Sequence, residues 1–84
     1  MDFEFYRNFI TVAETGNLTT ASKKLALAQP ALSAQIKTLE HYYGAKLIQT
    51  ARGKRQLTLT EAGEAFLGKA RQICHTEETI LLDM

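Results

Sequence analysis

Hydrophobic residues recur at helical spacing along four stretches of the chain, and polar residues mark where each stretch ends. The clearest stretch is 29–44, whose apolar residues are spaced by four, three and four. Pro30 suits the first turn of a helix, because its missing N–H is not needed there, and Gly44 suits the position just past the end. The inner face of this predicted helix holds Leu32, Ile36, Leu39 and Tyr43.

The opposite face of this helix is small, polar and almost uncharged. An ordinary solvated face would carry more glutamate and lysine, whereas this composition suits a helix that lies against a hydrogen-bonding surface. We interpret it as a helix that reads DNA. At 100° per residue the face comprises Pro30, Ala34, Lys37, Thr38 and His41, with Ser33 and Gln35 at its flanks.

Two shorter helices are predicted before it. Residues 3–15 carry an apolar helical stripe that Gly16 ends, and residues 18–26 follow Asn17, a good N-cap. Because residue 29 precedes a proline, the chain turns there and starts a new helix. A short helix, a tight turn and a longer helix with a polar outer face together make a helix-turn-helix.

The last predicted helix spans 61–83 and begins at Thr60, which serves as its N-cap. At ~1.5 Å per residue it would be about 34 Å long. It is apolar on more than one face, so the preceding residues cannot cover it, and we expect it to pair with its copy in a second chain. The expected contact residues, at heptad-like spacing, are Phe66, Ala70, Ile73 and Ile80.

Two strands are predicted between these helices. Residues 46–50 form the first, and 57–60 alternate apolar and polar, as a half-buried strand does. The loop between them carries Arg52, Lys54 and Arg55. By itself this would be an exposed polar loop, but its position beside the predicted reading helix favours a basic wing that contacts DNA.

Charge is distributed unevenly along the chain, although the net charge is only +1. Between residues 17 and 60, seven lysines and arginines accompany a single acidic residue, Glu40. Both ends of the chain are acidic. Because phosphate binding depends on local charge, the basic middle segment supports the nucleic-acid interpretation.

Composition restricts the class of protein further. A chain of 84 residues with 45% apolar content forms one small domain. No apolar run approaches the ~20 residues of a membrane span, and the start lacks a signal-peptide pattern. The single cysteine, Cys74, excludes an internal disulfide and fits a reducing compartment, so we expect a cytoplasmic, nucleoid-associated protein without membrane contact. No Cys/His cluster is present, so neither a metal nor a cofactor is expected.

Two other functions are less well supported. An enzyme is disfavoured because His41 and His75 lie on different predicted helices without a nucleophile motif or a glycine-rich phosphate loop. A winged helix used only for protein contact is disfavoured because the outer face of 29–43 lacks the large apolar anchors of such interfaces.

The motifs resemble the DNA-binding domain of LysR-type transcriptional regulators of bacteria. The resemblance covers nearly the whole chain, and several motifs occur in the right order. It rests on Thr20-Ala21-Ser22, Gln29-Pro30-Ala31-Leu32-Ser33, Gln35-Ile36, Leu39-Glu40, Gly44 with Leu47, and Leu59-Thr60-Glu61-Ala62-Gly63.

The resemblance implies a mainly α fold, a winged helix-turn-helix of three helices and a two-stranded wing, followed by a long linker helix that pairs two chains. It implies a DNA-binding domain at 1–60, a linker and dimerisation helix at 61–84, and binding to operator DNA as a homodimer. Full-length members continue into an effector-binding domain and form tetramers. We expect the chain to lack that domain.

The resemblance also implies roles for individual residues. The base-contacting positions are Gln29, Pro30, Ala31, Ser33 and Ala34, and those at phosphates are Asn17, Thr19, Thr20 and Lys37. Arg52 is the first candidate for the minor groove, with Lys54 and Arg55 left open.

Two departures from the family pattern affect these roles. Ala28 stands where the family usually has serine, which removes an N-cap and a possible phosphate contact. Residue 34 is often basic in the family, and alanine there favours apolar contact over an arginine–guanine bond.

Overall fold

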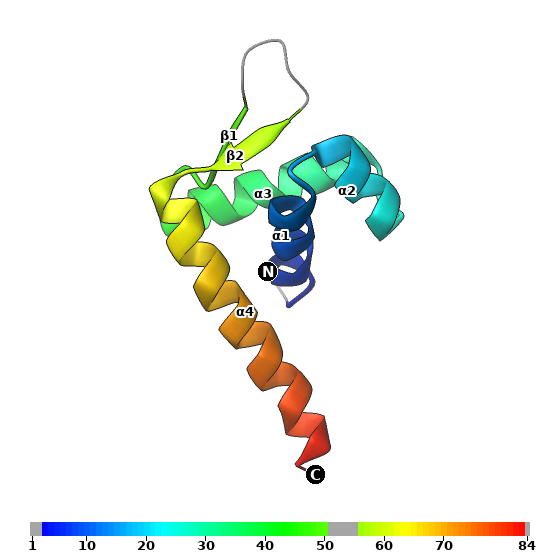
Figure 1. The fold of residues 1–84 in the computed structure, drawn as a ribbon, viewed down its shortest axis with the longest axis vertical. Helices are drawn as coiled ribbons and strands as arrows, with labels where there is room; N and C mark the ends of the chain where they lie inside the picture. Colours follow the sequence, from blue (N-terminus) through cyan, green and yellow to red (C-terminus); the bar gives the residue numbers. More distant parts are fainter. Residues whose placement is uncertain (1–2, 51–55, 84) are drawn as a thin grey trace.

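Four helices and one two-stranded antiparallel sheet make up the part of the chain that the structure describes. The computed structural model describes residues 3–50 and 56–83. It confirms the predicted mainly α, winged helix-turn-helix architecture and the order of its elements (Figure 1). The elements are α1 (Phe3–Thr15), α2 (Leu18–Leu25), α3 (Gln29–Tyr43), β1 (Ile48–Thr50), β2 (Leu57–Leu59) and α4 (Glu61–Leu82).

The first three helices form a head from which α4 extends as an arm. The strands project from the same head, and β1 pairs with β2 in antiparallel register, with Gln49 opposite Thr58. In Figure 1 the strands and the free end of α4 point in opposite directions. The molecule is accordingly elongated, with extents of 48 × 27 × 19 Å.

One apolar core holds the head together. The inner face predicted for α3 is buried as expected, except that Tyr43 remains 44% exposed. The first three helices and β2 contribute side chains that the helical or strand period turns inward, and Leu47 joins them from just before β1. The buried cluster comprises Phe9, Val12, Ala21, Leu32, Ile36, Leu39, Leu47 and Leu57.

Three left-handed residues end the first three helices. Gly16 and Gly44 adopt φ of 65° and 66°, as predicted, and glycine reaches this region without steric cost. Ala26 adopts φ of 55° after α2. Its turn is closed by the Leu27 N–H, which donates to the carbonyl of Ser22 at 2.9 Å. The turn of the helix-turn-helix therefore has an alanine at the left-handed position where glycine is usual, and backbone hydrogen bonds close the turn.

The first half of α4 packs into the head. The ring of Phe66 lies 4.8 Å from that of Phe9, 5.9 Å from Tyr6 and 5.2 Å from Tyr43. Ala70 is fully buried. The heptad pattern places Phe66 and Ala70 against a second chain, but α1 covers this face of α4 and both pack within their own chain.

Ion pairs extend the contact between α1 and α4 toward the free end. The Arg7 guanidinium donates to Glu77 at 2.5 Å and to Glu4 at 2.9 Å. Arg71 pairs with Glu14 at 3.3 Å. The hydrogen bond that Arg7 donates to Glu77 is the main cause that raises the pKa of Arg7. The pairs of Arg7 with Glu77 and of Arg71 with Glu14 join α1 to α4, whereas the pair of Arg7 with Glu4 lies within α1.

Gly63 allows α4 to start against the backbone of Leu47. A Cβ at this position would lie 2.0 Å from the Leu47 carbonyl oxygen, which is far inside van der Waals contact. The same oxygen accepts the Thr60 N–H at 3.0 Å. The Thr60 hydroxyl caps α4 by accepting the Gly63 N–H at 2.9 Å, as predicted from the sequence. The wing and the arm therefore meet at one tightly packed junction.

Candidate nucleic-acid interface

The outer face of α3 is exposed along its length. Gln29, Pro30, Ala31 and Ala34 are all exposed, and Ser33 is half-buried. These five residues, predicted to contact bases, thus lie together on the first turns of α3. The N-cap residue Ala28 makes no side-chain hydrogen bond, as expected from an alanine at the position where the family usually has serine. The first turn of α3 therefore keeps backbone N–H groups that an external acceptor can use.

Gln35 is not part of this exposed face. Its side chain is half-buried and its Oε1 accepts the Nδ2 of Asn8 at 2.7 Å. Asn8 itself is 3% exposed. The sequence places Gln35 on a flank of α3 but gives no sign of this contact, because its partner lies 27 residues away on α1.

The predicted phosphate-contacting residues divide between two helices. Lys37 is exposed on α3, and Thr20 is exposed on α2. Thr19 is half-buried beside it. The Asn17 side chain accepts the Thr20 N–H at 3.0 Å, which confirms its predicted role as N-cap. Its carbonyl oxygen is therefore engaged, and its amide N–H groups remain to donate.

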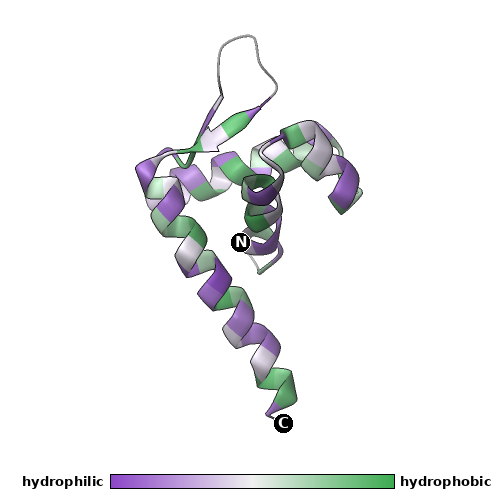
Figure 2. Ribbon diagram, in the orientation of Figure 1, coloured by the Kyte–Doolittle hydropathy of each residue, from purple (hydrophilic) through white to green (hydrophobic). Residues whose placement is uncertain are grey.

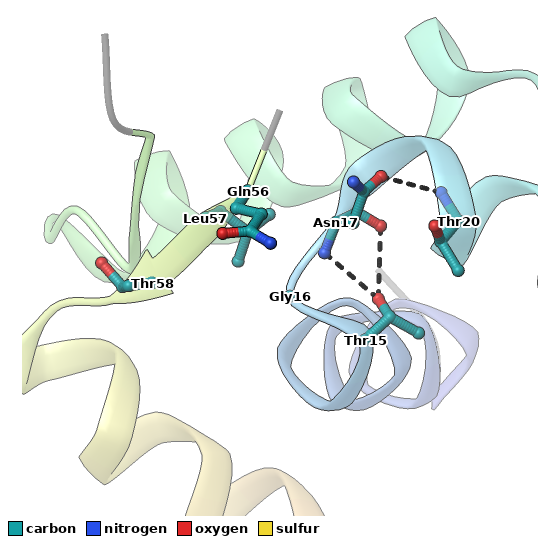
Figure 3. Close-up of a pocket in the computed structure, with 7 residues that line it drawn as sticks. All are labelled: Thr15, Gly16, Asn17, Thr20, Gln56, Leu57 and Thr58. Atoms are coloured by element: carbon teal, nitrogen blue, oxygen red, sulfur yellow. Dashed lines mark hydrogen bonds between the residues drawn. The ribbon is translucent and has the colours of Figure 1, made fainter. Parts of the chain in front are cut away.

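A pocket of about 600 Å³ separates the start of α2 from the wing strand β2. Figure 3 shows Asn17 and Thr20 on one side and Gln56 and Thr58 on the other. Asn17 forms an isolated bridge with Gln56, so the two sides are joined at one end. Sequence reasoning missed Gln56 and Thr58, although the period-two pattern that predicts β2 also turns alternate side chains outward.

Glu40 connects α3 to the wing. Its Oε2 accepts the backbone N–H of Leu47 at 2.8 Å and that of Ile48 at 3.3 Å. The single acid of the basic middle segment thus binds two backbone donors where β1 begins. Arg52, Lys54 and Arg55, predicted to form the basic tip of the wing, lie outside the described residues.

Besides Arg7, the side chains of Tyr43 and Cys74 have shifted pKa values. The hydrogen bond between the Tyr6 and Tyr43 hydroxyls, 2.6 Å long, together with partial burial, raises the pKa of Tyr43 to about 12. Burial raises the pKa of the Cys74 thiol, which is 5% exposed. The thiolate is the reactive form of cysteine, and burial disfavours it here. We therefore assign Cys74 a packing role and not a reactive one.

Other kinds of site are not found in the described residues. No group of three or more His, Cys, Asp or Glu residues among 3–50 and 56–83 could hold a metal ion. None of the helices in these ranges combines the length and apolar content that a membrane crossing requires.

The architecture and the exposed face of α3 define a winged helix-turn-helix domain. The family model for "bacterial regulatory helix-turn-helix protein, lysR family" matches residues 3–64. The chain belongs to this family.

Curated relatives agree with this assignment. The HTH-type transcriptional regulator BsdA of Bacillus subtilis is 42% identical over 84 residues, which cover 100% of this chain and 29% of BsdA. The Hca operon transcriptional activator HcaR of Escherichia coli is 42% identical over 82 residues, covering 98% of this chain and 27% of HcaR. The chain thus spans less than a third of the length of these relatives, both of which are named for transcriptional regulation.

Solved structures share the fold. A CbnR_DBD–DNA complex matches with a TM-score of 0.86 at 38% identity, over 93% of this chain and 87% of that one. A complex of BenM_DBD with catB site 1 DNA matches with a TM-score of 0.87 at 32% identity, over 96% and 88%. CbnR, a LysR family transcriptional regulator, matches with a TM-score of 0.84 over 93% of this chain and 26% of its own length.

Proposed function

We propose that this chain binds double-stranded operator DNA, sequence-specifically and as a dimer, as the DNA-binding part of a bacterial LysR-type transcription regulator. The observation that carries the proposal is the exposed, uncharged polar face at the start of α3. It belongs to a fold shared with chains crystallised on DNA. Such a regulator works in the cytoplasm, at the nucleoid.

Base reading is assigned to the first turns of α3. Gln29 can bond an adenine edge with both atoms of its amide, and Pro30 or Ala31 can contact a thymine methyl group. Ser33 can bond either kind of edge, whereas Ala34 offers only apolar contact. A helix with so few polar readers needs a second copy to specify a site.

Phosphate binding is assigned to residues on both sides of the reading helix. Asn17, Thr19, Thr20 and Lys37 fix the register of the domain on the duplex, and Gln56 extends this set across the pocket. The basic wing tip supplies the minor-groove contact, with Arg52, Lys54 and Arg55 as candidates.

The dimer contact is assigned to the exposed side of α4. With Phe66 and Ala70 packed inside the chain, Ile73 and Ile80 are the members of the four predicted contact residues that remain for a partner. Both line a groove of about 380 Å³ that also includes Phe3. We propose that residues 61–84 form the linker and dimerisation helix of a longer regulator, after a DNA-binding domain at 1–60. Tetramers would then be a property of the full-length form.

Selection of bound sequences from a random DNA pool tests this function. The chain should enrich a half-site repeated with two-fold symmetry, and footprinting should show both halves protected. Gln29→Ala should lower the affinity for the enriched site by roughly 1–3 kcal/mol and change binding to random duplex little. Failure to enrich any sequence would contradict the proposal, and an equal loss on both DNAs would remove Gln29 as a base reader.

A further inference from the structure

Asn8, which is buried, and Gln35, which is half-buried, form an amide contact between α1 and α3. The donor and acceptor lie 2.7 Å apart, and Asn8 is 3% exposed. The contact is not needed to bury α3, because Leu32, Ile36 and Leu39 already fill the core with at most 1% of their surface exposed. The hydrogen bond therefore adds a directional contact to apolar packing that already buries the inner face of α3.

A hydrogen bond restricts a helix in a way that apolar packing does not. Apolar burial is non-directional, whereas a hydrogen bond weakens steeply as its angle departs from linearity. A rotation of α3 by about 20° around its own axis would move side-chain ends, at a radius of roughly 5–6 Å, by about 2 Å. Such a shift would take a reading side chain out of hydrogen-bonding range of a base.

Gln35 is well placed to prevent this rotation. It follows Ala34 directly and lies beside the buried stripe, on the flank opposite Ser33. Its side chain turns inward to α1, while Gln29 and Ala34 remain exposed. Fixing Gln35 against α1 therefore fixes the rotation at which the outer face is presented.

We propose that Asn8 is a positioning residue for base recognition, which acts through Gln35 by setting the rotation of α3. Asn8 is buried on α1 and does not itself contact DNA. The proposal rests on the proposed function, since it concerns the discrimination between DNA sequences. It predicts that the contact contributes more to specificity than to stability.

Paired substitutions separate these two contributions. Asn8→Leu with Gln35→Met replaces both amides by apolar groups of similar size, which leaves no buried polar group unsatisfied and should keep the fold stable. The measured quantity is the affinity for the enriched site divided by the affinity for random duplex at one salt concentration. We expect this ratio to fall roughly fivefold, the equivalent of one net hydrogen bond, with unfolding by urea little changed.

Two further variants complete the test. Asn8→Gln with Gln35→Asn keeps an amide on each helix and should retain most of the ratio of affinities. If the apolar pair does not fold, this exchanged pair alone tests the positioning role of Asn8. Thr11→Val removes a half-buried hydroxyl of α1 that donates to the carbonyl of Arg7 within its own helix, and should leave the ratio unchanged.

The outcomes distinguish the two proposals. An unchanged ratio in a folded apolar pair, or a loss of the ratio in the exchanged pair, overturns the role of Asn8. If the wild-type chain itself binds the enriched and random duplexes equally, the proposed sequence-specific function fails instead.

Discussion

Gly63 shows how one missing Cβ determines where a helix can lie. Glycine in a helix interior is about 1 kcal/mol less favourable than alanine, so its presence needs a packing reason. Here the reason is the carbonyl oxygen of Leu47, which occupies the space of a side chain. Gly68 lies on the same helix, and a Cβ there would meet nothing within 4 Å.

The two glycines give opposite predictions for the same substitution. Gly63→Ala forces α4 away from Leu47 and should lower the free energy of unfolding by about 1–3 kcal/mol or more. Gly68→Ala should raise it by about 0.5–1 kcal/mol, because alanine restricts the unfolded chain without a clash. Urea unfolding of both variants measures the difference, and equal effects would show that the contact with Leu47 is not tight.

Glu40 joins two elements with one side chain. Its carboxylate accepts two backbone N–H groups at the start of β1, while the Ala45 N–H donates to its main-chain carbonyl at 3.1 Å. The wing therefore begins at a position set by the last turns of α3. This explains why a segment otherwise rich in lysine and arginine keeps one acid.

Glu40→Gln tests this link between α3 and the wing. A neutral amide accepts a hydrogen bond less strongly than a carboxylate, so the free energy of unfolding should fall by about 1 kcal/mol. The amides of Leu47 and Ile48 should exchange with solvent faster. Glu78→Gln is the matched control, since Glu78 is exposed on α4, and it should change stability by less than about 0.5 kcal/mol. Unaltered exchange at both amides would contradict the link.

The elements themselves could be predicted because their signals are local. The helix period, Asn17, Thr60 and the two glycines that end α1 and α3 all act within a few residues, and they determine where α2 and α4 begin and where α1 and α3 end. The side on which α4 is covered could not be predicted. Both its faces are apolar, and the position of α1 decides between them.

The part of the candidate site that lies on α3 could be predicted, whereas the contacts between distant segments could not. The exposed face of α3 follows from its own periodicity, so the residues predicted to read bases lie where expected. The contact of Gln35 with Asn8 and the approach of Gln56 to Asn17 join segments far apart in the sequence. Such contacts depend on the packing of whole elements and leave no periodic signal.

At the scale of the molecule, three exposed aliphatic side chains follow one another at the free end of α4. Ile80, Leu81 and Leu82 are 54%, 73% and 83% exposed. Figure 2 shows hydrophobic colour gathered at this end of the helix. A monomer would leave this surface in water, whereas pairing of two chains along α4 would bury it.

Ile80→Glu should therefore dissociate the proposed dimer without unfolding the head. Ile80 is 54% exposed and lines a groove with Phe3 outside the buried cluster, so a charge there should not disrupt the core. His75→Glu adds the same side chain at an exposed position on the other side of α4 and should leave the dimer intact. Sedimentation measures both. A dimeric Ile80→Glu variant with a normal circular dichroism spectrum would show that the partner contact lies elsewhere.

The packing at Gly63 sets the angle at which α4 leaves the head, and in the proposed dimer this angle would set the distance between the two reading helices along the DNA. Twenty-two residues of α4 make an arm of about 33 Å at ~1.5 Å per residue. A tilt of about 10° at its base would displace the far end by about 6 Å, which approaches two base-pair steps at ~3.4 Å each. In the proposed dimer, the distance between the two reading helices would therefore depend on how closely the first turn of α4 approaches the carbonyl oxygen of Leu47.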